Sequence, residues 1–159
     1  MARDLYYWDS NAFSGFLNEE PGKLGDCETV LKEAQAGHIL LVTSALTLAE
    51  VLFIKNGPKL DASQRDKIDR FFKADYITVR NVTRIIADLG RDVFWDHNIK
   101  PRDCVHVSTA IFYKISTMHT FDGGLLSKSE MTVNGHTLKI VKPRVPHQMD
   151  MIDESGKES

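Results

Sequence analysis

Four carboxylic acids stand where the chain is expected to pass from one element of secondary structure to the next. They are Asp9, Glu50, Asp103 and Asp122. Carboxylates that are brought together repel one another unless a cation neutralises them or some of them take up a proton. A cation bound by oxygen alone points to Mg²⁺ or Mn²⁺ rather than to Zn²⁺. Such a site suits phosphodiester hydrolysis, because the metal polarises the phosphoryl oxygens and lowers the pKa of a bound water.

Each acid also has a simpler explanation. Asp9 and Asp122 stand where a helix N-cap is expected, and Asp103 falls in the first turn of an expected helix, where it offsets the helix dipole. Glu50 is harder to explain in this way, because it is the only charged residue in the segment 43–53. A helix face exposed to solvent carries more charge than this segment does. For the three aspartates both explanations stay open.

The pattern of apolar residues predicts the strands and helices that bring these acids together. Short apolar runs alternate with longer segments of helical periodicity, which is typical of a parallel sheet covered by helices. We expect strands at 5–8, 39–43, 76–79 and 116–121, and helices at 12–17, 24–36, 44–52, 61–72, 82–96 and 100–113. Asn134-Gly135 predicts a type I′ hairpin between residues 131–133 and 138–141. The acids then share the carboxyl edge of the sheet, where open α/β folds bind ligands.

Length and composition indicate one folded domain. The chain has 159 residues, of which 42% are hydrophobic and 26% are charged. We expect a domain at 1–142 and an extended or disordered tail at 143–159. The net charge of -2 argues against a strongly basic nucleic-acid binder, so a polyanion site has to be a local patch. There is no apolar run of membrane length, no signal pattern and no metal-binding cysteine spacing, and we therefore expect a cytoplasmic protein without membrane association.

The segments around the acids resemble the PIN domain and, within it, toxin ribonucleases of the virulence-associated-protein-C (VapC) type. The resemblance covers residues 5–142 and is carried by Tyr7–Ala12, Thr43–Val51, Lys100–Asp103 with Val107–Ala110, and Thr120–Asp122. It implies a three-layer α/β/α fold with a mostly parallel central sheet, and RNA cleavage that depends on Mg²⁺ or Mn²⁺. It also implies a homodimer and, for the toxin branch, a cognate antitoxin whose tail blocks the site.

The resemblance further implies roles for individual residues. The catalytic set is Asp9, Glu50, Asp103, Asp122 and Thr120, and its four acids are the metal ligands. Ser10 and Asn11 assist at the site and, with Arg102 and Lys55, are the expected substrate-binding residues. Further cations that flank the acid-bearing segments are Lys59 and Lys128. For each cation a solvated surface charge is an equally good explanation.

Alternatives from other classes can be compared with the sequence. No Gly-x-Gly-x-x-Gly or Gly-x-x-x-x-Gly-Lys motif is present, so dinucleotide-binding and P-loop folds are excluded. A PIN-like module that binds RNA or protein without cleaving remains the alternative function, although the presence of all four acids argues against it. His106 is the only histidine placed to reach the site, and a packed histidine on a helix face is its simpler explanation. Cys104 is expected to be a small buried residue, and His119 is expected to be packed or exposed rather than catalytic.

The short helices carry more large apolar residues than a single core-facing side requires. Phe16 and Phe53 are expected to face another chain. Ile68, Phe71 and Phe72 form a stripe that is expected to enter the core.

Overall fold

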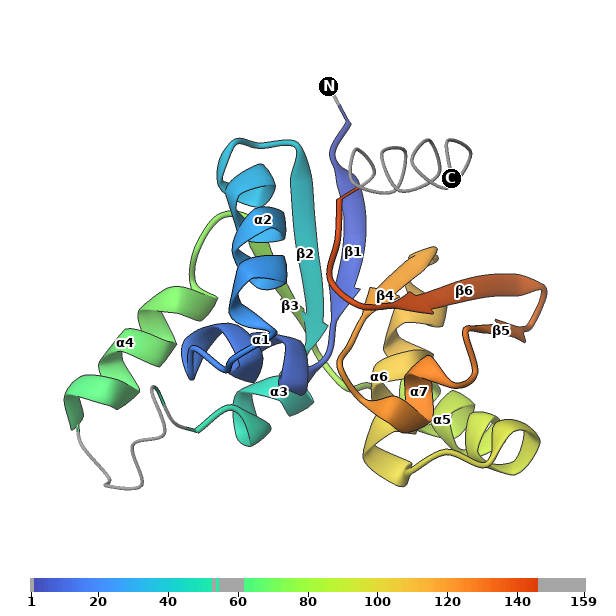
Figure 1. The fold of residues 1–159 in the computed structure, drawn as a ribbon. Coiled ribbons are helices and arrows are strands. Elements are labelled where there is room, and N and C mark those ends of the chain that lie inside the picture. Colours follow the sequence, from blue (N-terminus) through green and yellow to red (C-terminus); the bar gives the residue numbers. More distant parts are fainter. Residues whose placement is uncertain (1, 53, 55–61, 146–159) are drawn as a thin grey trace, which may run out of the picture.

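A single central sheet organises the computed structural model, which describes residues 2–52, 54 and 62–145 (Figure 1). In this part of the chain six strands lie in the order β3-β2-β1-β4-β6-β5. Their bounds are β1 Asp4–Trp8, β2 Ile39–Ser44, β3 Ile77–Arg80, β4 Thr117–His119, β5 Glu130–Val133 and β6 His136–Val141. Only the β5–β6 pair is antiparallel among these strands. The expectation of an α/β fold with a mostly parallel sheet is therefore confirmed.

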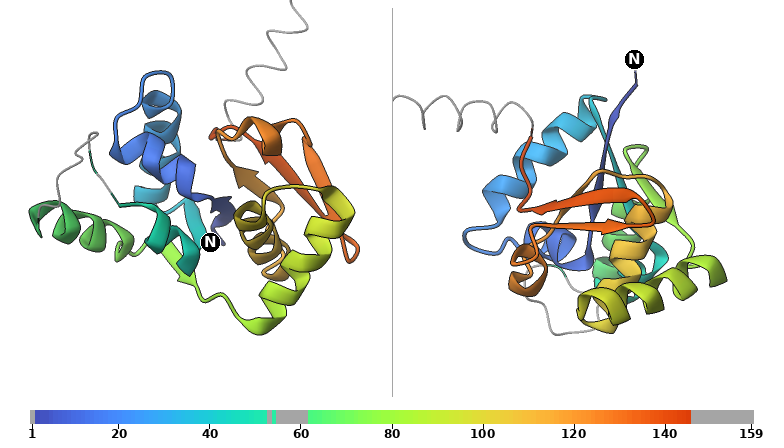
Figure 2. Two further views of the ribbon diagram at one scale, coloured as in Figure 1. Left: turned by 90° about the horizontal axis from the view of Figure 1, so that it is seen from below. Right: turned by 90° about the vertical axis from the view of Figure 1, so that its right-hand side faces the viewer.

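Helices cover both faces of this sheet. Their bounds are α1 Ser10–Leu17, α2 Leu24–Gln35, α3 Ala45–Glu50, α4 Ala62–Phe72, α5 Arg84–His97, α6 Pro101–Phe112 and α7 Gly123–Leu126. Seen along the sheet, α1, α2 and α4 lie on one side, and α5 and α6 on the other (Figure 2). This is the three-layer α/β/α arrangement that the resemblance implied.

Two apolar clusters, one on each face of the sheet, form the core. Successive residues of a strand point to opposite faces. Tyr6, Trp8 and Leu41 accordingly pack with α1 and α2, whereas Tyr7 and Val42 pack with α5 and α6. The continuous apolar runs of β1 and β2 are explained by this double coverage, because a parallel sheet is buried on both faces.

Parallel pairing places the ends of β1, β2 and β4 at one edge of the sheet. Tyr7 of β1 is paired with Val42 of β2 and with Met118 of β4, so these strands are in register as well as parallel. The helices α1, α3 and α7 begin directly beyond this edge, and α6 begins close to it (Figure 1). The edge is therefore where the acids named above can meet.

Two elements are shorter than their sequence patterns predict. The strand expected at 116–121 ends at His119, because the Thr120 hydroxyl and the Phe121 N–H turn to side chains of the β1–α1 junction. The helix expected at 44–52 ends at Glu50, and Val51 leaves it with extended backbone. The predicted hairpin is present, with positive φ values of 49° at Asn134 and 78° at Gly135.

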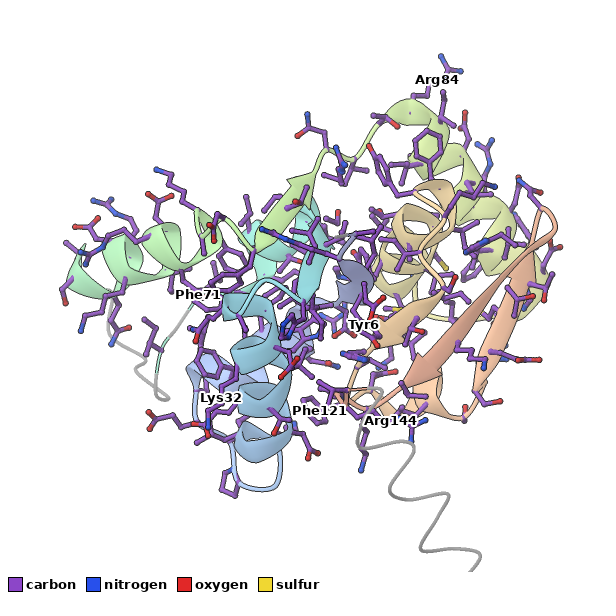
Figure 3. The ribbon with its side chains drawn as sticks, turned by 90° about the horizontal axis from the view of Figure 1, so that it is seen from above. Tyr6, Lys32, Phe71, Arg84, Phe121 and Arg144 are labelled. Carbon is purple, nitrogen blue, oxygen red and sulfur yellow. The ribbon has the colours of Figure 1, made fainter. Side chains whose placement is uncertain are left out.

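The apolar stripe of α4 enters the core. Phe72 is buried, and Ile68 and Phe71 pack against the cluster below α1 and α2. Phe71 lies where α4 meets that layer (Figure 3). Phe16, which was expected to face another chain, is half-buried and stacks on Phe71 with ring centroids 5.7 Å apart. Phe53 lies outside the described residues.

The segment after β6 continues along the core as far as it is described. Val145 is buried in the same cluster as α1 and α2, so packed structure reaches at least this residue. The remainder of the expected tail, 146–159, lies outside the described residues. None of the helices in the described ranges has the length and apolarity that crossing a membrane requires.

Candidate active site

Asp9 is the most deeply buried of the four acids. It directly follows β1 and is 2% exposed. Its Oδ1 accepts a hydrogen bond from the Ala12 N–H at 3.1 Å and thereby caps α1, while its Oδ2 accepts one from the Thr120 hydroxyl at 2.5 Å. Burial raises the pKa of Asp9 to about 6, although the electrostatic influence of the His106 ring and these two hydrogen bonds act in the opposite direction. The carboxylate therefore lacks full compensation for its charge.

Thr120 and Asn11 link this acid to the loop after β4. The Thr120 Oγ1 that donates to Asp9 also accepts a hydrogen bond from the Asp122 N–H at 3.0 Å. Asn11 Oδ1 accepts one from the Phe121 N–H at 3.0 Å. Because two junctions far apart in sequence are joined in this way, Asp9 and Asp122 are held at the same edge of the sheet.

Asp122 and Asp103 form the next part of the site. Asp122 Oδ2 accepts a hydrogen bond from the Leu125 N–H at 2.9 Å and caps α7, while its Oδ1 lies 4.0 Å from Lys100 Nζ. Asp103 lies in the first turn of α6 and is 8% exposed. Its pKa is raised by burial and then by the negative charge of Asp122. Asp103 also raises the pKa of Asp9, so the three aspartates interact electrostatically.

Glu50 reaches the site from the last residue of α3. Its Oε1 lies 2.9 Å from His106 Nε2, its Oε2 lies 3.8 Å from an Arg102 guanidinium nitrogen, and the Ser10 hydroxyl also hydrogen-bonds to it. Burial raises the pKa of Glu50, but the hydrogen bond and electrostatic influence of His106, together with Ser10 and Arg102, outweigh burial and lower it. The carboxylate form of Glu50 is thus stabilised by its neighbours.

His106 takes a larger part than the sequence suggested. The ring is 1% exposed, and while Nε2 faces Glu50, Nδ1 lies 2.6 Å from the hydroxyl oxygen of the fully buried Tyr7. The spacing of one helical turn from Asp103 was the only signal in the sequence that pointed to it. Tyr7 carried no signal beyond its place in a buried strand. Cys104 is buried as expected. His119 is packed rather than exposed, and the indole N–H of Trp8 donates to its Nδ1 at 2.9 Å.

The expected cations are only partly placed at the site. Arg102 flanks Glu50 with its side chain 66% exposed, and Lys100, which was not proposed as an RNA contact, flanks Asp122. Lys128 is exposed in the turn after α7. Lys55 and Lys59 lie outside the described residues.

The four acids offer the donor atoms that a divalent metal needs, but their side chains are not arranged around a common point in this structure. Within residues 2–52, 54 and 62–145, no group of three or more His, Cys, Asp and Glu side chains is close enough to hold a metal ion. All four acids offer oxygen donors, which Mg²⁺ and Mn²⁺ prefer. Burial raises the pKa of both Asp9 and Asp103, which is the electrostatic situation that a bound cation relieves.

The simpler explanation offered for the aspartates is confirmed. Asp9 and Asp122 are true N-caps, and Asp103 does lie in the first turn of α6. The same three residues, with Glu50, also gather at one edge of the sheet. An acid-bearing carboxyl edge in a three-layer fold is the feature that the PIN resemblance predicted.

The chain belongs to the PIN domain family, whose pattern it matches over residues 6–130. The fold is similar to that of VapC20 from Mycobacterium tuberculosis, described as a toxin that cleaves the sarcin-ricin loop, with a TM-score of 0.59 and 14% identity over 74% of this chain and 90% of that chain. It is also similar to a toxin-antitoxin complex from Klebsiella pneumoniae, with a TM-score of 0.59 and 15% identity over 88% of this chain and 99% of that chain. None of the curated proteins matches this sequence. At such identities the similarity establishes the fold alone.

Proposed function

We propose that this chain is a metal-dependent endoribonuclease and the toxin of a toxin-antitoxin pair. The observation that carries the proposal is the meeting of Asp9, Glu50, Asp103 and Asp122 at the carboxyl edge of the sheet in a member of the PIN domain family. Support for the substrate class comes from VapC20, which is described as a toxin that cleaves the sarcin-ricin loop.

The proposed roles of the residues follow from their surroundings. The metal would be held by the four acids, and when bound it supplies Lewis acidity that neutralises charge on the phosphate and acidifies water. Thr120 fixes the orientation of Asp9 through its 2.5 Å hydrogen bond, and Asn11 holds the neighbouring backbone. Ser10 hydrogen-bonds to Glu50.

Binding of the substrate is assigned to cations beside the acids. Arg102 and Lys100 both precede Asp103 in sequence and lie near Glu50 and Asp122 respectively. Once a metal neutralises the acids, these two side chains are free to contact phosphates of the RNA. Their placement makes a local basic patch in a chain of net charge -2.

Cleavage of defined RNAs tests the activity directly. The purified chain is expected to cut RNA with Mg²⁺ or Mn²⁺ and to stop when a chelator is added. Asp9→Asn is expected to abolish cutting while the exposed Asp75→Asn leaves it unchanged. Cutting that survives chelation refutes the metal-dependent mechanism, and RNA binding without cutting under any metal favours the non-cleaving module.

An antitoxin and a second copy of the chain are the proposed protein partners. The structure from Klebsiella pneumoniae is described as a toxin-antitoxin complex. Leu48 and Leu52, on α3 and just after it, are 45% and 58% exposed close to Glu50. Large apolar side chains exposed beside a site are typical of a surface that another chain covers.

A further inference from the structure

We propose that Tyr7 and His106 are positioning residues that hold one carboxylate oxygen of Glu50 and leave its second oxygen available to a metal at the candidate site. The inference rests on the proposed function, since it takes Glu50 as a metal ligand. It adds two residues to the site, one of which lies wholly inside the protein.

A continuous chain of hydrogen bonds joins three elements behind the site. The Tyr7 hydroxyl oxygen lies 2.6 Å from His106 Nδ1, and His106 Nε2 lies 2.9 Å from Glu50 Oε1. Tyr7 and His106 are both essentially buried, with exposed fractions of 0% and 1%. Their rings also meet edge to face, with centroids 5.7 Å apart. Packing therefore restricts both side chains to this arrangement.

The direction of these hydrogen bonds follows from which groups can donate and which can accept. A carboxylate only accepts, so His106 has to donate from Nε2 to Glu50. In a neutral imidazole Nδ1 then carries no proton and accepts, which requires the Tyr7 hydroxyl to donate. Burial raises the pKa of Tyr7 well above its usual range, so its hydroxyl retains the proton needed for this role. Tyr7 thereby selects the ring tautomer that can hold Glu50.

Glu50 needs such support because its own element is short. It is the last residue of the six-residue α3, and the backbone leaves the helix at Val51. A side chain at such a helix end is poorly fixed by its own backbone, since fraying begins there. His106, by contrast, lies within the twelve-residue α6, one turn beyond Asp103.

The hydrogen bonds connect the elements that carry the proposed ligands. β1 supplies Tyr7 and is followed by Asp9, and α6 supplies both His106 and Asp103. The hydrogen bonds thus tie Glu50 to the same two elements that position Asp9 and Asp103. Partners of this kind behind a metal ligand commonly change metal affinity or activity by about 10- to 100-fold when they are removed.

Mn²⁺ binding to the purified full-length chain, measured by titration calorimetry without RNA, tests this role. His106→Leu is expected to weaken Mn²⁺ binding about 10- to 100-fold. Tyr7→Phe is expected to weaken it about fivefold, as the loss of one neutral hydrogen bond implies. His106→Gln, which keeps an N–H donor near the position of Nε2, is expected to recover most of the loss seen with leucine.

A matched control separates positioning from general loss of packing. Thr109 is buried on the same helix and donates to the Val105 carbonyl at 2.7 Å without touching an acid. Thr109→Val removes one buried hydrogen bond and is expected to leave Mn²⁺ affinity unchanged. In a Glu50→Gln background, His106→Leu is expected to cause no further loss of affinity, because the group that it positions is already gone.

A spectroscopic measurement examines the arrangement without any metal. Long-range ¹H–¹⁵N correlation spectra of the metal-free chain are expected to show the His106 proton on Nε2, and Tyr7→Phe is expected to increase the form protonated on Nδ1. A ring protonated on Nδ1 alone in the parent overturns the inference. Equal Mn²⁺ affinity of the parent, His106→Leu and His106→Gln overturns it while leaving the proposed function intact. A parent that binds no Mn²⁺ overturns the metal-dependent function and the positioning role together.

Discussion

Replacing Asp9 with asparagine is expected to stabilise the metal-free protein at neutral pH. Burial raises the pKa of Asp9 from 3.8 to about 6, and at about 1.4 kcal/mol per pH unit the ionised form in the fold is disfavoured by about 3 kcal/mol. Asparagine removes this cost and keeps an oxygen that can accept the Ala12 N–H. The Thr120 hydroxyl loses its charged acceptor, which costs about 1 kcal/mol. A net gain of about 2 kcal/mol corresponds to a rise in Tm of about 4–8 °C for a domain of this size.

The stabilisation of the fold by Asp9→Asn should depend on pH in a defined direction. Because the pKa is higher in the folded state than in the unfolded state, the folded protein binds the extra proton between about pH 4 and pH 6. The free energy of unfolding contributed by Asp9 therefore falls as pH rises through this window and stays low above it. The advantage of Asp9→Asn should be largest at pH 7.5, smaller at pH 5 and absent near pH 4.

Thermal melts in the presence of a chelator measure this advantage at each pH. Asp75→Asn is the matched control, since Asp75 is exposed and its carboxylate forms no hydrogen bond or ion pair with the part of the chain that the structure describes. The control should melt with the parent at every pH. Adding Mn²⁺ should raise the Tm of the parent and leave that of Asp9→Asn unchanged. A loss of several degrees in Asp9→Asn at pH 7.5 would show that Asp9 serves mainly as a structural cap, and the electrostatic reasoning would be refuted.

Three further outcomes are expected. RNA affinity of an inactive Asp9→Asn chain should fall as salt rises, and Arg102→Gln should reduce the slope of log affinity against log salt by about one; an affinity that does not depend on salt in filter binding contradicts the phosphate contacts. Thr120→Val, which is nearly isosteric, should lower RNA cleavage about 10- to 100-fold while the metal-free fold remains intact by circular dichroism; unchanged cleavage removes Thr120 from the site. Leu52→Lys and Phe53→Lys should both weaken self-association in sedimentation velocity; a parent that is monomeric at high micromolar concentration ends the homodimer proposal.

The order of the elements could be predicted because local physics specifies it. The caps Asp9 and Asp122, the proline that opens α6 and the Asn134-Gly135 turn each act within a few residues, so the sequence alone reveals them. Parallel pairing then brings the carboxyl ends of β1, β2 and β4 together, and the acids with them. This is why the edge that carries the candidate site was predictable without coordinates.

What could not be predicted depends on contacts between distant segments. Tyr7 and His106 are 99 residues apart, and His106 and Glu50 are 56 residues apart. No local pattern marks such a pair, since a tyrosine in a buried strand and a histidine on a buried helix face are both ordinary core residues. The early end of β4 has the same origin, because it depends on side chains at the β1–α1 junction.

Hydrogen bonds within the protein hold Asp122 and Glu50 at the edge of the sheet without a metal. In Asp122 one oxygen is held by the Leu125 N–H while the other faces Lys100, and in Glu50 one oxygen is held by His106 while the other faces Arg102. The fold therefore fixes one oxygen of each carboxylate and leaves the second opposite an exposed cation. Asp9 differs, since both of its oxygens accept hydrogen bonds from the protein and neither faces an exposed cation. Burial raises the pKa of Asp9 to about 6 despite these hydrogen bonds, and Asp9 is consequently the acid whose ionisation should gain most when a divalent cation arrives.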